Sequence, residues 1–319
     1  QPKMLALLFF GTLLLLLGVY LPGIGLSEGG ANRWVHLGPA TFQPAELAKI
    51  VIILYLSRFF ARRYEDGTIN DPSRSLKAPM FAVGAYALLI LFQTDLGSTL
   101  ILLTISGAIL YYSGISKRRI ARLILLGIAF IAAFVIITML IPPLKELIWT
   151  PNRIGRLTSF LDPFSHQQDS GFQVVHSYIA IALGGVTGSG LGNSIQKMGY
   201  LPAPYTDFIM AIVAEELGMI GVILVLGGIG FIIYRAIWIT WKSKDVQRQL
   251  MGVGIATLFA VQTILNVGGL TGMIPLTGVP LPFISYGGTS LILLSLTVGI
   301  LMNLVKATKL ELESNKRSV

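Results

Sequence analysis

The chain contains no cysteine and only 12% charged residues. Without cysteine it can use neither disulfides nor thiol chemistry. An ordinary soluble domain has about a quarter of its residues charged, so this composition does not fit that class. Apolar residues make up 54% of the 319 residues. Several runs approach the roughly 20 apolar residues that cross a bilayer. We therefore predict an all-α fold, a polytopic bundle of transmembrane helices.

Residues that could hold a metal or a nucleotide are also scarce. The three histidines, His36, His166 and His176, are scattered, which argues against a structural zinc site. No Ser-His-Asp spacing can be argued. The glycine run "GGVTGSGLGNS" (184–194) lacks the ending of a phosphate-binding loop, so we interpret it as a site of close packing. Carboxylate-bound Mg²⁺ or Mn²⁺ stays open, because these ions need few protein ligands and are shared with phosphates.

Hydropathy predicts eight transmembrane helices. Their predicted bounds are 4–26, 44–61, 78–95, 97–113, 120–141, 207–235, 249–270 and 288–307. The turn "QTDLGS" (93–98) between the third and fourth is short, which leaves a re-entrant pair as an alternative. A cleavable signal peptide pattern is absent. We expect residues 1–319 to form one integral-membrane domain.

The basic residues predict the orientation of the helices. The net charge is +9, and most of the 24 Lys and Arg residues lie in alternate loops, at 57–77, 117–122 and 235–248 and in the C-terminal tail. By the positive-inside rule, both termini of the chain are cytoplasmic. Topology then accounts for the basic patches, and we predict no nucleic-acid binding.

This orientation places the longest loop, 142–206, on the outer side of the membrane. Connections longer than about 15 residues are usually functional or disordered. The loop contains "GFQVVHSYIAIALGG" (171–185), which we predict to be an interfacial or re-entrant helix. His176 in this segment is one of our candidates for substrate binding.

A second outer segment, "GANRWVHLGPATFQPAELAK" (30–49), enters the membrane as a helix. Pro44 suits the first helical position, and Glu46 in the first turn complements the helix dipole. Lys49 follows three residues later on the same face. The pair could be an internal salt bridge of a capped helix. Alternatively, it could line a cavity, because ionisable groups below the headgroups usually mark functional sites.

Further polar candidates lie on the same side. Asp95 could cap a helix at a tight turn or contribute to a site. Arg33 could contact headgroups or bind a phosphate. Arg153 and Arg156, three residues apart, suit a pyrophosphate, because guanidinium groups bind phosphate oxygens in a bidentate fork. Their alternative role is contact with anionic lipid. Lys197 adds another cation.

Three acids occur in "YLPAPYTDFIMAIVAEELG" (200–218), a segment that becomes an apolar helix. We predict Thr206 as the N-cap and Asp207 as the first helical residue. Glu215 follows about 12 Å deeper, at 1.5 Å per residue. A carboxylate at that depth should be paired, cavity-lining or protonated. Three aligned acids favour a functional entrance over simple capping.

We expect Glu215 and Glu216 to be structural or cavity-lining, with Lys49 as a partner. The nearby loop "GMIPLTGVPLPFISYGGTS" (272–290) is uncharged, and its three prolines break helicity. Membrane-level backbone of this kind is tolerated only where it is buried in protein or faces a cavity.

These blocks resemble the SEDS family (shape, elongation, division and sporulation), the group of RodA, FtsW and SpoVE. The segments that carry the resemblance span nearly the whole chain: "GANRWVHLGPATFQPAELAK", "QTDLGS", "GLGNSIQKMGYLPAPYTDFIMAIVAEELG" and "GMIPLTGVPLPFISYGGTS". Family members typically have ten transmembrane helices. The two that are missing here would precede Gln1, so we expect an N-terminally truncated chain with unchanged orientation.

The resemblance implies a peptidoglycan glycosyltransferase of the bacterial cytoplasmic (inner) membrane. Such an enzyme polymerises lipid II on the outer leaflet, for elongation, division or sporulation. It works beside a class B penicillin-binding protein, which crosslinks the product. The family's catalytic aspartate corresponds to Asp207, and Glu46 and Lys49 match family positions in the cavity below the outer face.

We therefore predict that Asp207 is the general base that deprotonates the acceptor sugar. The departing pyrophosphate would be stabilised by nearby cations, with a divalent ion as a further option. The cations are Arg33, Lys49, Arg153, Arg156 and Lys197. A lipid II flippase or other transporter is the alternative, since intramembrane charges and broken helices suit transporters as well. A non-enzymatic scaffold ranks third.

Overall fold

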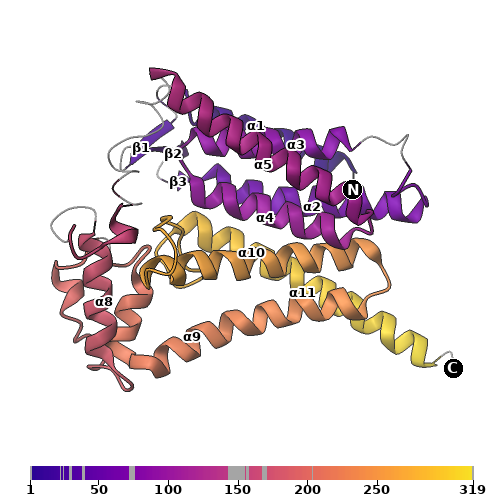
Figure 1. Cartoon of the computed structure of the whole chain (residues 1–319). Coiled ribbons are helices and arrows are strands. Elements are labelled where there is room, and N and C mark those ends of the chain that lie inside the picture. The colour runs from indigo at the N-terminus through magenta and orange to yellow at the C-terminus, as the bar shows by residue number, and fades with distance from the viewer. Residues whose placement is uncertain are drawn as a thin grey trace. The chain divides into compact units, whose positions relative to one another are not determined.

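The computed structural model describes residues 2–21, 23, 25–28, 31–37, 40–71, 76–142, 155, 158–166, 171–202 and 204–317. Arg153 and Arg156 lie outside the described residues. The described part of the chain is mainly helical (Figure 1). It divides into two compact units, which we describe separately. Unit 1 comprises Gln1–Ser116, Ile229–Val261 and Gly287–Val319; unit 2 comprises Lys117–Gly228 and Gln262–Tyr286. The prediction of a single domain stays a prediction.

Each of the eight predicted segments contains a helix. In unit 1 the helices are α1 (Pro2–Gly18), α2 (Pro44–Glu65), α3 (Lys77–Phe92) and α4 (Leu96–Tyr112). Unit 2 contains α5 (Lys117–Leu140), α8 (Phe172–Gly184) and the short 3₁₀ helix η1 (Gln196–Met198). Two helices, α9 (Ile209–Lys242) and α10 (Val246–Leu270), have residues in both units, and α11 (Gly288–Arg317) belongs to unit 1. The predicted helix at 171–185 is α8.

Several predicted boundaries were wrong by some residues, most of all those of α1 and α11. The first helix was expected to reach residue 26, but α1 ends at Gly18. Gly23, which follows the helix, has a φ of +86°, a backbone conformation that favours glycine and ends regular structure. At the other end, α11 continues past residue 307 to Arg317. Hydropathy marks the apolar span, whereas the helix itself continues through the polar residues that follow.

A small antiparallel sheet was missed by the all-α prediction. Its strands are β1 (Gly25–Glu28), β2 (Ala31–Leu37) and β3 (Ala40–Phe42), in the order β1-β2-β3. Val35 pairs with Phe42 and is buried, whereas His36 is exposed. This alternation is what a half-buried strand requires. The sheet leads directly into α2 and carries Arg33 on its middle strand.

The core of unit 1 lies around α2, which packs against α1, α4 and α11. Ile52, Leu56 and Phe60 on this helix are almost completely buried. A Cβ at Gly254 of α10 would lie 2.8 Å from the Ile53 side chain, so the glycine permits close packing.

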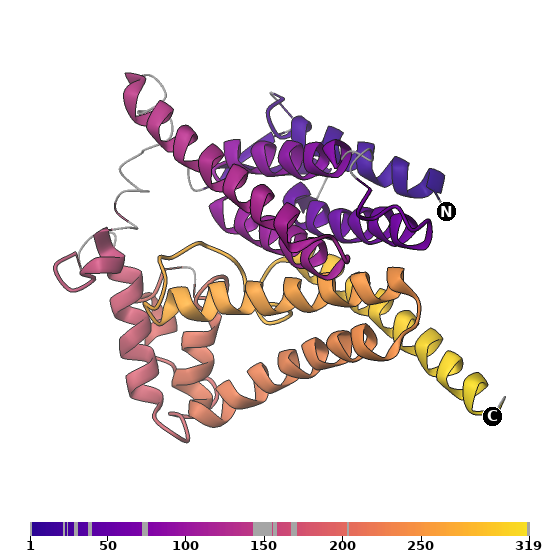
Figure 2. The ribbon, with the colours of Figure 1, turned by 45° about the vertical axis from the view of Figure 1, so that its right-hand side comes forward.

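Unit 2 contains a bend in α9. Gly218 has non-helical dihedral angles of φ 63° and ψ −161°, and the helix changes direction there (Figures 1 and 2). The residues before the bend form the short piece 209–217. Beside them run the glycines of the 184–194 segment. The backbone N–H of Ser189 donates to Glu215 O at 2.9 Å, and that of Met219 donates to Gly185 O at 3.1 Å.

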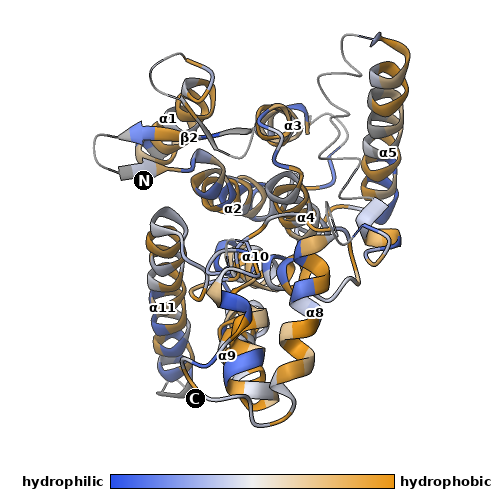
Figure 3. Cartoon of the chain, turned by 90° about the vertical axis from the view of Figure 1, so that its left-hand side faces the viewer, coloured by the Kyte–Doolittle hydropathy of each residue, from blue (hydrophilic) through white to orange (hydrophobic). Residues whose placement is uncertain are grey.

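The described helices are mainly hydrophobic along their length (Figure 3). By length and composition, three of them could cross a membrane: Ile209–Lys242, Val246–Leu270 and Gly288–Asn315. Four shorter apolar helices lie at Lys3–Gly18, Lys77–Phe92, Leu96–Tyr112 and Phe172–Gly184. Large apolar side chains such as Leu7, Phe81 and Ile292 are between 69% and 79% exposed. A lipid environment accounts for such exposure.

The glycine packing in unit 2 predicts a stability difference between two Gly→Ala variants. A Cβ at Gly184 would lie 1.8 Å from Ala214 O, so Gly184→Ala should destabilise the protein by about 1–3 kcal/mol. A Cβ at Gly227 would meet nothing within 4 Å, so Gly227→Ala is the matched control. Thermal unfolding of the purified variants in detergent measures the difference. Equal melting temperatures would show that α8 does not need the close approach.

Candidate functional site

The Glu46–Lys49 pair lies in the first turns of α2, as predicted. Pro44 occupies the start of the helix, and Lys49 Nζ lies 2.7 Å from Glu46 Oε1. The two side chains are only 2% and 1% exposed. The two residues therefore form the internal salt bridge that the sequence offered as one alternative, and this salt bridge is buried. Each partner offsets the desolvation of the other, because a single buried charge would be costly.

Asp95 caps α4 in unit 1. Its Oδ1 accepts from the N–H of Ser98 at 2.9 Å, and its Oδ2 accepts from Gln43 Nε2 at 3.2 Å. Both carboxylate oxygens accept hydrogen bonds, and the side chain is buried. Asp95 therefore has the helix-capping role, which was one of its two predicted alternatives. Its predicted role in substrate binding stays a prediction.

Arg33 reaches the turn that precedes Asp95. Its Nη2 donates to Thr94 O at 2.6 Å, and Thr94 has a φ of 65°, which is unusual for a residue other than glycine. The guanidinium has five N–H donors. Its described partner is a neutral carbonyl, so Arg33 keeps its full positive charge.

Asp207 lies in unit 2, in the turn that precedes α9. Helical bonding starts with Ala211 N–H donating to Phe208 O at 2.9 Å. Asp207 was predicted to be the first helical residue, but α9 begins at Ile209. Pro202 and Pro204 lie just before, and proline cannot continue a backbone hydrogen-bond ladder. The half-buried Asp207 lines a cavity of about 10 Å³ with Asn266 and Thr277.

A proline-broken loop holds the Asp207 turn. Asn266 Nδ2 donates to Asp207 O at 2.8 Å, and Ser285 Oγ donates to Thr206 O at 2.6 Å. The N–H of Tyr286 donates to Tyr205 O at 2.7 Å. Neither Asn266 nor Ser285 was among the sequence-predicted candidates. A detectable signal was the pair of amides at 262 and 266, one helical turn apart in the largely apolar second half of α10.

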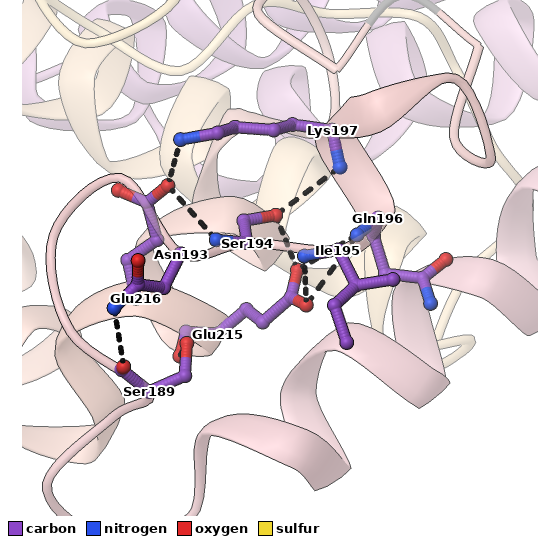
Figure 4. A network of polar contacts seen from close by, with 8 residues as sticks. All are labelled: Ser189, Asn193, Ser194, Ile195, Gln196, Lys197, Glu215 and Glu216. Carbon is purple, nitrogen blue, oxygen red and sulfur yellow. Dashed lines mark hydrogen bonds and ion pairs between the residues drawn. The ribbon is translucent and has the colours of Figure 1, made fainter.

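Glu215 accepts hydrogen bonds from the segment at the start of η1 (Figure 4). Its carboxylate accepts from Ser194 Oγ at 2.5 Å and from the N–H of Ile195 at 2.8 Å. The side chain is 1% exposed. Glu215 is therefore structural, which is one of the two expected roles.

Glu216 forms an ion pair with Lys197, and Figure 4 shows both beside the Glu215 carboxylate. The partners of the two glutamates are thus Ser194 and Lys197, where the sequence had suggested Lys49. Lys197 was predicted to be one of the cations that stabilise the leaving group. Its ammonium is paired with Glu216, and its predicted role stays a prediction.

His176 lies near the same segment. Its Nδ1 is 2.7 Å from Gln196 Oε1, and its ring contacts Phe172 at a centroid distance of 4.2 Å. Since Gln196 also approaches Glu215, His176 belongs to the polar network around η1. Its predicted role in substrate binding stays a prediction.

The described residues contain no cluster of three or more His, Asp or Glu side chains that could hold a metal ion. Glu46 and Glu216 are paired with Lys49 and Lys197, and Glu215 accepts from Ser194 and from backbone N–H groups. Mg²⁺ or Mn²⁺ shared with substrate phosphates would need fewer protein ligands, so that cofactor stays a prediction, and no step proposed below uses one.

Residues 2–310 match the family model described as "Cell cycle protein", which covers FtsW, RodA and SpoVE. The chain belongs to this family. It is 39% identical to the probable peptidoglycan glycosyltransferase FtsW of Bacillus subtilis over 295 residues, 92% of this chain and 72% of the relative. It is 35% identical to stage V sporulation protein E of the same organism, covering 96% of this chain and 79% of the relative.

Solved structures share the fold of this chain. A chain from the structure "Structural coordination of polymerization and crosslinking by a peptidoglycan synthase complex" is 26% identical and gives a TM-score of 0.70. The match covers 96% of this chain and 82% of that one. RodA of Thermus thermophilus, 24% identical, gives a TM-score of 0.63 over 96% of this chain and 79% of its own, and supports the fold alone. The predicted family, helical membrane fold and enzyme class, a peptidoglycan glycosyltransferase, are confirmed.

The Glu215 network predicts a second stability difference. Glu215→Ala would remove the acceptor for the Ser194 hydroxyl and the Ile195 N–H, so it should cost about 2–4 kcal/mol. Glu216→Ala is the matched control, because its ion pair with Lys197 is partly exposed and exposed pairs contribute little. Thermal unfolding in detergent tests this order. If Glu216→Ala were the more destabilising variant, Glu215 would not be the main anchor.

Proposed function

We propose that this chain polymerises lipid II into glycan strands on the outer leaflet of the bacterial cytoplasmic membrane, with Asp207 as the general base. The observation that carries the proposal is the position of Asp207. It is half-buried in a turn at the start of an apolar helix, and the side chains of Asn266 and Ser285 bond that turn. A carboxylate held in this way can accept a proton from a bound hydroxyl group.

The reaction joins two sugars. The 4-hydroxyl of the acceptor attacks the anomeric carbon of a polyprenyl-pyrophosphate-linked donor, and the proton of that hydroxyl passes to the Asp207 carboxylate. The bond from the anomeric carbon to the pyrophosphate breaks, and the configuration at that carbon inverts. Positioned acid–base catalysis of this kind contributes about 10²–10⁴-fold to a rate.

The leaving pyrophosphate needs positive charge. Lys49 and Lys197 are each paired with a glutamate, so they have little net charge to offer. Arg33 is bonded to a neutral carbonyl and retains its charge. We propose that Arg33, together with Arg153 and Arg156 of the outer loop, stabilises the negative charge of the leaving group. For Lys49 and Lys197 we propose an indirect role, which is to keep Glu46 and Glu216 compensated.

The proposal includes a partner and an orientation. The solved complex that resembles this chain is a peptidoglycan synthase complex that couples polymerisation to crosslinking. We propose a class B penicillin-binding protein as the partner of this chain as well. The distribution of Lys and Arg supports an orientation with both termini of the chain in the cytoplasm and Asp207 on the outer side.

Asp207→Asn should lower the rate of polymerisation about 10²-fold, because an amide cannot accept the proton. The protein is reconstituted in liposomes with its penicillin-binding partner and labelled lipid II, and glycan products are resolved on a gel. Asp162→Asn is the control, since Asp162 is an exposed acid of the outer loop bonded to Ser165.

Three outcomes would contradict the proposal in different ways. Normal polymerisation by a folded Asp207→Asn protein would exclude this aspartate as the base. Transfer of lipid II between leaflets without glycan products would support the transporter alternative. Neither products nor transfer from the wild-type protein would support the scaffold alternative.

A further inference from the structure

Three consecutive carbonyls of the Asp207 turn accept hydrogen bonds from one segment of unit 2. These carbonyls belong to Tyr205, Thr206 and Asp207, and their donors are Tyr286 N–H, Ser285 Oγ and Asn266 Nδ2. We infer that Asn266 and Ser285 are positioning residues, which hold the Asp207 carboxylate where the acceptor hydroxyl must lie. This inference rests on the proposed function of Asp207.

Asn266 joins the turn to the loop with a single side chain. Its Nδ2 donates to Asp207 O at 2.8 Å and to Val279 O at 2.9 Å. A primary amide nitrogen has two N–H donors, so both are used. The side chain is 4% exposed, so water is poorly placed to replace either bond. A residue with one donor or none could not fix both backbones at once.

Ser285 makes the second connection. Its hydroxyl accepts from the N–H of Leu281 at 2.7 Å and donates to Thr206 O at 2.6 Å. The surrounding loop contains Pro280 and Pro282, which lack an N–H, and Phe283 has a φ of 66°. A loop with so few backbone donors depends on the Ser285 side chain to hold its shape against the turn.

The position of the turn should affect the rate more than the binding of lipid II. Asn266 and Ser285 bond backbone carbonyls, so they act on the reaction only through the placement of Asp207. A displacement of about 1 Å in a reacting group can reduce a rate by about a hundredfold. Loss of an interaction that matters only in the transition state lowers kcat and leaves KM nearly unchanged.

Gln262 provides a matched control for Asn266. It lies one helical turn earlier on α10, is completely buried, and donates through Nε2 to Pro280 O at 3.0 Å. Gln262 and Asn266 therefore bond adjacent carbonyls of the same loop. Of these two amides, only Asn266 has a described hydrogen bond to the Asp207 turn as well. A comparison of the two alanine variants separates the loop contact from the turn contact.

The first experiment measures kcat and KM for lipid II in the reconstituted polymerase, with thermal stability measured in parallel. Asn266→Ala and Ser285→Ala should lower kcat by about 10–100-fold with KM within about twofold. Gln262→Ala should lose comparable stability but keep kcat within about twofold of wild type. Ser285→Thr retains the hydroxyl and should restore most of the rate. If Asn266→Ala and Gln262→Ala reduced kcat equally, the inference would be overturned.

A double variant tests whether Asn266 acts through Asp207. Residual turnover of Asp207→Asn should be the same with and without Asn266→Ala, because the position of the turn no longer affects the rate once the base is absent. If Asn266→Ala slowed the Asp207→Asn protein by the same factor as it slows wild type, Asn266 would act independently of Asp207 and the inference would fail.

A measurement without substrate separates this inference from the proposed function. The chain has no cysteine, so Tyr205→Cys, at an exposed side chain of the turn, can carry a single nitroxide label. Asn266→Ala and Ser285→Ala should increase the mobility of the label in its electron paramagnetic resonance spectrum, and Gln262→Ala should not. Unchanged spectra in all variants would show that Asn266 and Ser285 do not hold the Asp207 turn, and this would overturn the inference. Increased mobility beside normal turnover of Asp207→Asn would refute only the proposed base.

Discussion

Backbone groups in an apolar environment must find partners within the protein, and this constraint explains most of the polar contacts in the structure. At several places where a helix stops, side chains bond the exposed N–H and C=O groups. Asp95 and Glu215 accept from N–H groups, and Asn266 donates to two carbonyls. These residues look like candidates for chemistry because they are polar. Their contacts show that they shape the places where the chain leaves the helical state.

Two of these sets of hydrogen bonds hold the same short helical piece, 209–217. Glu215 bonds the 194–196 segment near the end of the piece 209–217, and Asn266 and Ser285 bond the turn before it. Glycines let the 184–194 segment approach closely, since a Cβ at Gly188 would lie 2.2 Å from Glu216 O. The helix that follows Asp207 is therefore held at both ends. If Asp207 is the general base, as proposed, this rigidity favours catalysis, because catalysis depends on the placement of the base.

Charge is used sparingly, and most of the candidate charges in the described residues balance one another. Lys49 compensates Glu46, and Lys197 compensates Glu216. In a buried pair, loss of one partner costs more than the pair itself contributes, so both partners are needed even without contact to substrate. This distinguishes the lysines from Arg33, whose described bond is to a carbonyl. In the proposed reaction, the positive charge that stabilises the pyrophosphate would then come mainly from arginines.

The sequence by itself determined the helical membrane fold, the family and the order of the polar segments, because hydropathy and motifs are properties of neighbouring residues. It also indicated the Glu46–Lys49 pair, whose members are one helical turn apart. Only the tertiary structure decided which residues are the hydrogen-bond and ion-pair partners of the other polar side chains. Asn266 is 59 residues from Asp207, and Lys197 is 19 residues from Glu216, and local spacing does not show such contacts. The small sheet was missed for a similar reason, since its strands are short and pair through backbone bonds. A partner in an apolar interior is chosen by proximity in space, and that proximity comes from how the helices bend and pack.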